Sequence, residues 1–288
     1  MATLREIRKR IRSIRNIAQV TRAMQTVSAS RMRRAQLATL ASRPYAERSW
    51  EVLGHLASRL TEGQRRAEPL LAVRPVRAVE VALITAQRGL CGGYNHNVIQ
   101  AAVAFMAGQT VPVRVVTIGR KGREYLSRHG ADIVADFEVL DRPSPDDVRP
   151  IARLLIDDFL HGRADQVWLV YTDFVNTLVQ RPKVQLLLPA QSAEPAAPGA
   201  RVPYLFEPDP ETILGPMLAR FIELGVYQAI LEAQASEHSA RMVAMRNATD
   251  NALGLIAEMT LSYNKARQEA ITKEIIDIVG GAAALARR

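Results

Sequence analysis

The residues of this sequence that could do chemistry are few, and the densest group is the stretch RGLCGGYN at residues 88–95. A glycine-rich turn between a strand and a helix can bind phosphate through its backbone N–H groups. This stretch, however, lacks both the GxGxxG spacing of dinucleotide-binding turns and the GK[ST] ending of a P-loop. The pattern therefore favours a tight turn at which only glycine fits, with Gly89, Gly92 and Gly93 as structural residues.

Nucleophilic, acid–base and metal-binding side chains form no recognisable constellation. Cys91 is the only cysteine, and no Cys–His arrangement follows from the sequence. The pairs Asp146–Asp147 and Asp157–Asp158 fall on a predicted helix or at its start, where solvated or capping roles are expected. The histidines show no metal-ligand spacing; they are His55, His96, His129, His161 and His238. We therefore predict no catalytic residue, no metal and no cofactor.

A single cysteine also excludes an internal disulfide and favours a reducing compartment. No uninterrupted apolar run approaches the ~20 residues that span a bilayer. The N-terminus is rich in arginine and poor in acids, as a mitochondrial transit peptide would be. Its apolar pattern continues without a break to Met32, however, which argues against a cleaved leader.

The net charge of +9 is concentrated at one end of the chain. Residues 1–60 hold 13 basic and 3 acidic side chains (+10), residues 61–208 hold 17 and 16 (+1), and residues 209–288 hold 8 and 10 (−2). A basic end could suit nucleic acid, an anionic membrane surface or an acidic protein. Residues 1–40 contain no aromatic side chain for base stacking, which argues against nucleic acid.

The basic N-terminal stretch has the apolar periodicity of a long helix. Thr3 and Glu6 have the spacing of a capping box at its start. One apolar face follows steps of three and four residues: Leu4, Ile7, Ile11, Ile14 and Ala18. A second stripe follows: Ile17, Val20, Met24 and Val27. Apolar residues on more than one face indicate a helix that is surrounded. Pro44 marks a kink or a restart, with Tyr45–Leu60 helical again.

The C-terminal stretch has a longer repeat. Apolar residues occupy 14 of 17 positions at a mean spacing of 3.5 between Leu214 and Ala270, which predicts a left-handed supercoil. After Ala270 the stripe shifts to Ile271, Ile275 and Ile278, which indicates a change of partner. About 70 helical residues would span ~105 Å, whereas a globule of the whole chain would have a radius of gyration of ~19 Å. Such a helix must project and needs a partner, for which the N-terminal helix is the obvious candidate. Breaks at Gly225 and Gly254 would instead allow an ordinary helical bundle.

The middle of the chain has the pattern of a small α/β domain with a largely parallel sheet. Buried strands are expected at Val79–Thr85, Val113–Ile118, Val167–Tyr171 and Val184–Leu188. Ser144–His161 is an amphipathic helix with Pro145 near its start, and residues 189–203 are a loop. The predicted organisation is an N-terminal helix at 1–60, an α/β domain at 77–205 and a C-terminal helix at 209–288.

Four stretches of this sequence resemble the γ subunit of F-type ATP synthases. They are TLREIRKRIRSIRNIAQVTRAMQTVSASRMRRAQ, RGLCGGYN, VYTDFVNTLVQRPKVQLLLP and SEHSARMVAMRNATDNALGLIAEMTLSYNKARQEAITKEIIDIVGGAAAL. The resemblance covers essentially the whole chain. It implies a long antiparallel two-helix coiled coil with a Rossmann-like α/β domain inserted between its helices. The redox-regulated cysteine pair of the chloroplast forms is absent, since this chain has only Cys91.

The resemblance also implies a function. The chain would be a non-catalytic rotor shaft, present once per complex, at the cytoplasmic face of a bacterial plasma membrane. It would turn inside a hexamer of α and β subunits and join the ε subunit and the membrane c-ring, with δ in the same complex and no nucleic acid. Two other classes remain open: a basic coiled-coil nucleic-acid binder, and a small nucleotide-binding enzyme built on the α/β domain.

Four shaft residues are implied as contacts with the β subunits. They fall in the TRAM, MVAMRNATDN and KARQEAIT blocks: Met24, Arg241, Gln268 and Thr272. Arg241 and Gln268 would offer polar side chains on a shaft otherwise rich in alanine and methionine. For Met24 the alternative is a place in the coiled-coil core. The apolar end VGGAAAL, at 279–285, resembles the tip that turns in the hydrophobic sleeve of the hexamer.

Overall fold

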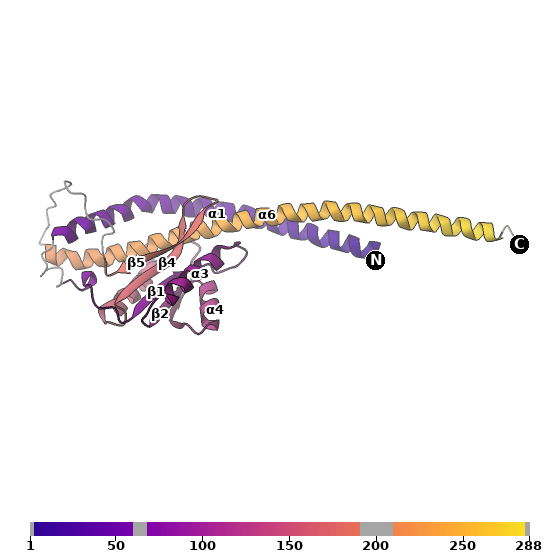
Figure 1. The fold of residues 1–288 in the computed structure, drawn as a ribbon. Coiled ribbons are helices and arrows are strands. Elements are labelled where there is room, and N and C mark those ends of the chain that lie inside the picture. The colour runs from indigo at the N-terminus through magenta and orange to yellow at the C-terminus, as the bar shows by residue number, and fades with distance from the viewer. Residues whose placement is uncertain (1–2, 60–67, 191–209, 286–288) are drawn as a thin grey trace. The chain divides into compact units, whose positions relative to one another are not determined.

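The computed structural model describes residues 3–59, 68–190 and 210–285 (Figure 1). The chain divides into two compact units: Met1–Val27 with Met242–Arg288, and Ser28–Arg241. Two helices, α1 (Leu4–Arg59) and α6 (Pro210–Leu285), contribute residues to both units. The predicted loop from residue 191 onward, and Leu60, lie outside the described residues.

In the first unit, α1 and α6 pack as antiparallel helices. The hydroxyls of Thr21 and Thr249 are 2.7 Å apart, and the Arg8 guanidinium donates to the Tyr263 hydroxyl at 2.5 Å. The later α1 residue pairs with the earlier α6 residue, which defines the antiparallel direction. The predicted capping box is confirmed, because Glu6 N donates to Thr3 Oγ1 (3.3 Å) and Thr3 N donates to Glu6 Oε2 (2.9 Å).

The predicted stripes of both helices agree with the observed burial. Every position of the 3.5-residue repeat from Leu214 to Ala266 is buried or half-buried, and so is the first stripe of α1. Three residues of the second α1 stripe are more than half exposed: Ile17 (52%), Val20 (58%) and Val27 (53%). This second face is therefore not covered by the described part of the chain.

The last turns of α6 extend past the start of α1. Because Arg8 pairs with Tyr263, the start of α1 at Leu4 lies roughly one helical turn further along α6. From Ala270 onward no described α1 residue reaches α6, and Ile271, Ile275 and Ile278 are 49–66% exposed. The predicted change at Ala270 thus coincides with the point where the partner helix stops.

Both long helices are continuous. α1 includes Pro44 and α6 includes Gly225 and Gly254, so the alternative of a bundle broken at these glycines is wrong. By length and composition alone, one helix among the described residues could cross a membrane: Ile213–Val279 of α6, whose most apolar window is 44% buried. Counting uninterrupted apolar runs did not detect it. Core helices of soluble proteins pass the same test of length and composition, so the finding does not assign α6 to a membrane.

The second unit contains a five-stranded sheet in the order β3-β2-β1-β4-β5. Its strands are β1 (Val79–Ile84), β2 (Val113–Ile118), β3 (Asp132–Phe137), β4 (Gln166–Phe174) and β5 (Gln180–Leu188). Only the β4–β5 pair is antiparallel, so the largely parallel sheet and the four predicted strands are confirmed. The edge strand β3 was missed, because its sequence DIVADF has no continuous apolar run.

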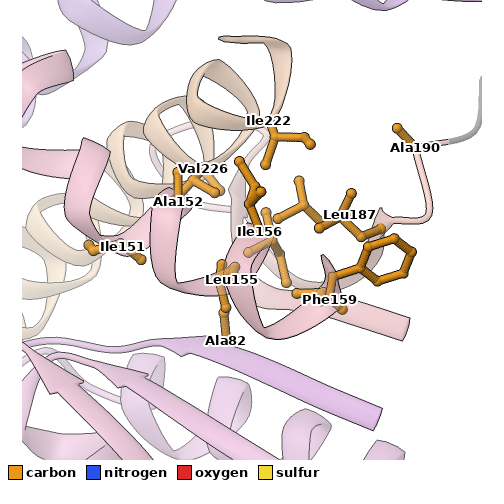
Figure 2. Close-up of a cluster of buried hydrophobic side chains, with 14 of the residues drawn as sticks. Ala82, Ile151, Ala152, Leu155, Ile156, Phe159, Leu187, Ala190, Ile222 and Val226 are labelled. Carbon is orange, nitrogen blue, oxygen red and sulfur yellow. The ribbon is translucent and has the colours of Figure 1, made fainter. Parts of the chain in front are cut away.

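Helices cover both faces of this sheet. Val81 and Leu83 of β1 pack on α3 (Tyr94–Ala107) and α4 (Arg120–Arg128). Ala82 and Ile84 face α5 (Pro145–Leu160) and the beginning of α6, where Leu155 and Phe159 join Ile222 and Val226 in one buried cluster (Figure 2). Burial on both faces accounts for the unbroken apolar character of β1.

The two acidic pairs on α5 lie in different environments. Asp147 completes a capping box with Ser144, as expected for a residue in the first turn. Asp158, expected to be solvated, is instead buried and forms ion pairs with Arg114 (3.0 Å) and Arg163 (2.6 Å). Beside it lies Glu80 of β1, whose side chain is fully buried. Burial, and then the neighbouring Asp158, raises the pKa of Glu80 to about 8.

Candidate functional site

The RGLCGGYN turn leads from β1 into α3. Gly92 has φ +57°, a left-handed conformation that favours glycine although Leu90 adopts φ +61° in the same turn. Gly93 has φ −80°, and no atom lies within 4 Å of a Cβ at Gly89. The backbone conformation thus favours glycine at Gly92, whereas Gly89 and Gly93 have no positive φ that would call for it. The Asn95 side chain accepts from Ala86 N (3.0 Å) and donates to Cys91 Sγ (3.1 Å). Burial raises the pKa of the Cys91 thiol, which disfavours a nucleophilic thiolate.

This difference between the glycines can be tested by a matched pair of substitutions. Gly92→Ala is expected to lower the free energy of unfolding by about 1–2 kcal/mol, because a side chain disfavours the left-handed conformation. Gly89→Ala should have little effect, because the space is open. Urea denaturation of the two purified variants gives the comparison. Equal losses would mean that the backbone conformation of Gly92 is not what limits this position.

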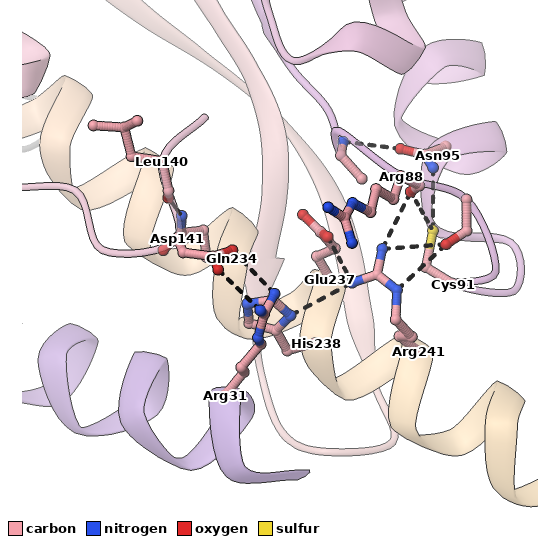
Figure 3. A network of polar contacts seen from close by, with 12 residues as sticks. Arg31, Arg88, Cys91, Asn95, Leu140, Asp141, Gln234, Glu237, His238 and Arg241 are labelled. Carbon is pink, nitrogen blue, oxygen red and sulfur yellow. Dashed lines mark hydrogen bonds and ion pairs between the residues drawn. The ribbon is translucent and has the colours of Figure 1, made fainter. Parts of the chain in front are cut away.

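Arg241 of α6 binds this turn, which follows the carboxyl end of β1. Its guanidinium donates to the carbonyl oxygens of Arg88 (3.1 Å) and Gly89 (3.3 Å) and forms a 2.7 Å ion pair with Glu237 (Figure 3). The side chain is only 10% exposed. One buried arginine therefore connects the long helix to the turn that the sequence singled out.

Three further side chains on the same stretch of α6 make equivalent contacts. Gln234 donates to the carbonyl of Leu140, Ser236 to that of Thr172 (3.2 Å) and Ser239 to that of Thr177 (2.6 Å). Leu140 follows β3, Thr172 lies near the end of β4, and Thr177 lies in the β4–β5 turn. We call residues 234–241, QASEHSAR, the anchor segment.

The anchor segment occupies the place where α/β sheets of this type bind ligands. In such sheets the ligand lies beyond the carboxyl ends of the strands, where the strand order reverses. That point falls between β1 and β4 in this sheet. Here α6 side chains already bind the backbone carbonyls at both strand ends, which argues against a nucleotide site. Among the described residues, no group of three or more His, Cys, Asp or Glu side chains could hold a metal ion.

The charges around Arg241 are set by burial. Burial, and then the nearby Arg241 and Arg31, lower the pKa of His238 to about 4. His238 is therefore neutral, and its Nδ1 lies 3.5 Å from the Arg241 guanidinium, which can only donate. Burial also raises the pKa of Glu237, against the opposing effect of Arg241. Arg31 of α1 adds a second connection through a bidentate ion pair with Asp141 (2.9 Å) after β3.

Comparison with known proteins assigns the chain to a family. A family model described as ATP synthase matches residues 3–285. The ATP synthase gamma chain of Dehalococcoides mccartyi (strain 195) is 51% identical over 287 residues, covering 99% of this chain and 100% of the relative. This chain belongs to the ATP synthase gamma chain family.

Solved ATP synthase assemblies contain chains with the same fold. In the rotor of the Euglena gracilis mitochondrial ATP synthase, one chain matches with a TM-score of 0.66 and 18% identity, covering 93% of this chain and 98% of that one. A chain of the Euglena gracilis OSCP/F1/c-ring structure matches with a TM-score of 0.67 and 18% identity, covering 98% and 94%. At this identity the likeness concerns the fold, and it agrees with long terminal helices flanking an α/β domain.

The four predicted contact residues of the gamma chain have different surroundings. Met24 is half-buried on α1, whereas Gln268 and Thr272 are exposed on α6, all three in the first unit. Arg241 belongs to the second unit, and its guanidinium is engaged within the chain. The premise that Arg241 offers a free polar side chain is therefore wrong, while contact with a β subunit stays a prediction for all four.

Sequence reasoning did not find the anchor segment. Its signal was present, however, since QASEHSAR places polar residues all around a helix inside an otherwise apolar repeat. All eight residues of the segment except Ala240 are buried. Buried polar side chains need hydrogen-bond partners, so such a run predicts that other backbone surrounds the helix.

Proposed function

We propose that this chain is the central rotor shaft of an F-type ATP synthase. As a non-catalytic subunit it couples ion flow through the membrane c-ring to ATP synthesis and hydrolysis at the β subunits of a surrounding α/β hexamer. The observation that carries the proposal is membership of the gamma chain family over essentially the whole chain. One of the matching Euglena gracilis chains belongs to an assembly with F1 and a c-ring, which supports the same partners here.

The uncovered apolar surfaces fit a shaft that other subunits enclose. Ile17, Val20 and Val27 on α1, and the end of α6 from Ile271 onward, would be costly to leave in water. A hexamer around the helices would bury them. The α/β domain would join the ε subunit and the c-ring, with δ in the same complex. One copy per complex would then sit peripherally at the cytoplasmic face of a bacterial plasma membrane.

The mechanism requires no chemistry in this chain. A single asymmetric shaft cannot make identical contacts with three equivalent β subunits, so it biases each toward a different conformation and nucleotide affinity. Turning the shaft moves these biases around the hexamer. The shape of the shaft and its stiffness are then the properties on which coupling depends.

Subunit composition tests this proposal. The tagged chain would be purified gently from the membranes of its own cell, and the ratios of its partners would be measured by mass spectrometry. Three α, three β and one copy of this chain, together with c subunits, are expected. Recovery as a free protein, or with nucleic acid, would overturn the proposal.

A charge at Met24 is expected to weaken coupling. Met24 belongs to the second apolar stripe of α1 and is half-buried there, so a lysine adds a charge at a packed contact. Met24→Lys should lower the number of protons pumped per ATP hydrolysed several-fold in membrane vesicles, while hydrolysis continues. The exposed Gln19 provides the matched control, Gln19→Lys. Unchanged pumping per ATP in Met24→Lys would rule out a packed contact at this position.

A further inference from the structure

The anchor segment holds α6 from two opposite sides. Residues advance by about 100° around a helix with 3.6 residues per turn. Gln234 and Arg241 therefore point in nearly the same direction, toward the carbonyls of Leu140, Arg88 and Gly89. Ser236 and Ser239 point roughly the opposite way, toward the carbonyls of Thr172 and Thr177.

An apolar contact occupies the side between these two. Ala235 packs with Phe174 at the end of β4 and with Ala35 of α1. The segment is thus enclosed by the ends of the strands, the turns that follow them and the first helix. A turn of α6 about its own axis, in either sense, would displace the donors on both sides from their carbonyl acceptors.

The hydrogen bonds suit a mechanical role better than apolar packing alone would. The hydrophobic effect is non-directional, whereas hydrogen bonds weaken steeply when their angles change. Ser236 and Ser239 are fully buried. If α6 turned and their hydroxyls lost the carbonyl acceptors, no bulk water could accept a hydrogen bond instead. All the acceptors are backbone carbonyls, whose positions are fixed by the sheet and its turns.

We propose that the anchor segment is a torsional clamp, which makes α6 and the α/β domain of this chain turn as one body. The inference rests on the proposed function, because a rotor must pass torque between its α/β domain and its long helix. Ser236 and Ser239 are then positioning residues. Arg241 has an additional role in holding the RGLCGGYN turn.

The clamp can be weakened on one side by Ser236→Ala combined with Ser239→Ala. The measurement uses the assembled complex with its hexamer fixed to a surface and a bead attached to the α/β domain. In the absence of rotation, the angular variance of the bead reports torsional stiffness. Losing these two hydrogen bonds is expected to raise the variance by less than twofold, because the apolar cluster around Ile222 and Val226 still holds α6 against the α/β domain. The rate of ATP hydrolysis without load should stay near that of the parent.

Thr260→Ala is the matched control. It also removes one hydroxyl from α6, but that hydroxyl donates only to Ile256 of the same helix. Its angular variance should equal that of the parent. A merely structural role of the serines would lower thermal stability without changing the angular variance of the assembled complex.

The outcomes separate the clamp from the proposed function. If the parent complex rotates and the double variant is as stiff as the parent, the clamp is wrong and the rotor stands. If the parent chain assembles with no hexamer, the proposed function fails instead. Should the double variant not assemble, the two single variants are measured separately, and parental stiffness in both would overturn the clamp.

Discussion

Arg241→Ala is expected to lower the free energy of unfolding of the purified chain by roughly 3–5 kcal/mol, a magnitude typical of breaking a buried ion pair. The substitution leaves the buried Glu237 without its 2.7 Å partner. It also removes the guanidinium that donates to the carbonyls of Arg88 and Gly89. Both losses act on the turn after β1, so the α/β domain should be the part that is weakened. Urea denaturation followed by circular dichroism measures the change.

Two further variants identify the cause of that loss. Arg246→Ala removes an exposed arginine from the same helix and should change stability little. Adding Glu237→Gln to Arg241→Ala should recover part of the loss, because a neutral amide is less costly to bury than an unpaired carboxylate. A loss in Arg241→Ala no larger than that in Arg246→Ala would show that the buried ion pair does not stabilise the domain.

Glu80 is expected to make the stability of the chain fall as pH rises. Its folded pKa of about 8 lies above the ordinary value of 4.5, so between these values the folded state binds more protons than the unfolded state. The free energy of unfolding should therefore decrease by up to about 1.4 kcal/mol per pH unit in this window. Above about pH 8 both states are ionised, and this contribution becomes constant.

Glu80→Gln removes the titrating group and keeps the shape of the side chain. The variant should lose most of the decline between pH 5 and 8 and should be more stable than the parent at pH 8 and above. The physical reason is that a buried amide spares the α/β domain an ionised carboxylate beside Asp158. Chemical denaturation of both proteins across this pH range gives the comparison. Parallel curves for variant and parent would show that Glu80 is not the group responsible.

The sequence predicts the elements whose pattern is local. The 3.5-residue repeat of α6 and the apolar runs of β1 and β2 depend on spacing along one element, and both were located correctly. Strand β3 was not predicted, because it is a half-exposed edge strand and its aspartates interrupt the apolar run. The helix breaks considered at Gly225 and Gly254 do not occur, since glycine only weakens a helix and tertiary packing outweighs its propensity.

The roles of individual polar residues could not be predicted, because they depend on contacts distant in sequence. Asp157 and Asp158 are equivalent in a sequence pattern, yet only Asp158 faces the sheet and meets Arg114 of β2. From the helical pattern alone, Arg241 is expected to be a free cation. The structure shows that it instead donates to the carbonyl of Arg88 in the turn after β1. In the same way, the strands and turns around the anchor segment are brought together by the strand order of the sheet. No local sequence pattern predicts that order.

The central claim is that this chain is a rotor, and rotation itself tests it most directly. The chain would be assembled with its α and β subunits, the hexamer fixed to a surface, and a bead attached to the α/β domain would be followed while ATP is hydrolysed. Steady turning in one direction, with three equivalent pauses per turn for the three β subunits, is the result that we predict. Continued ATP hydrolysis with a bead that stays fixed relative to the hexamer would contradict the account.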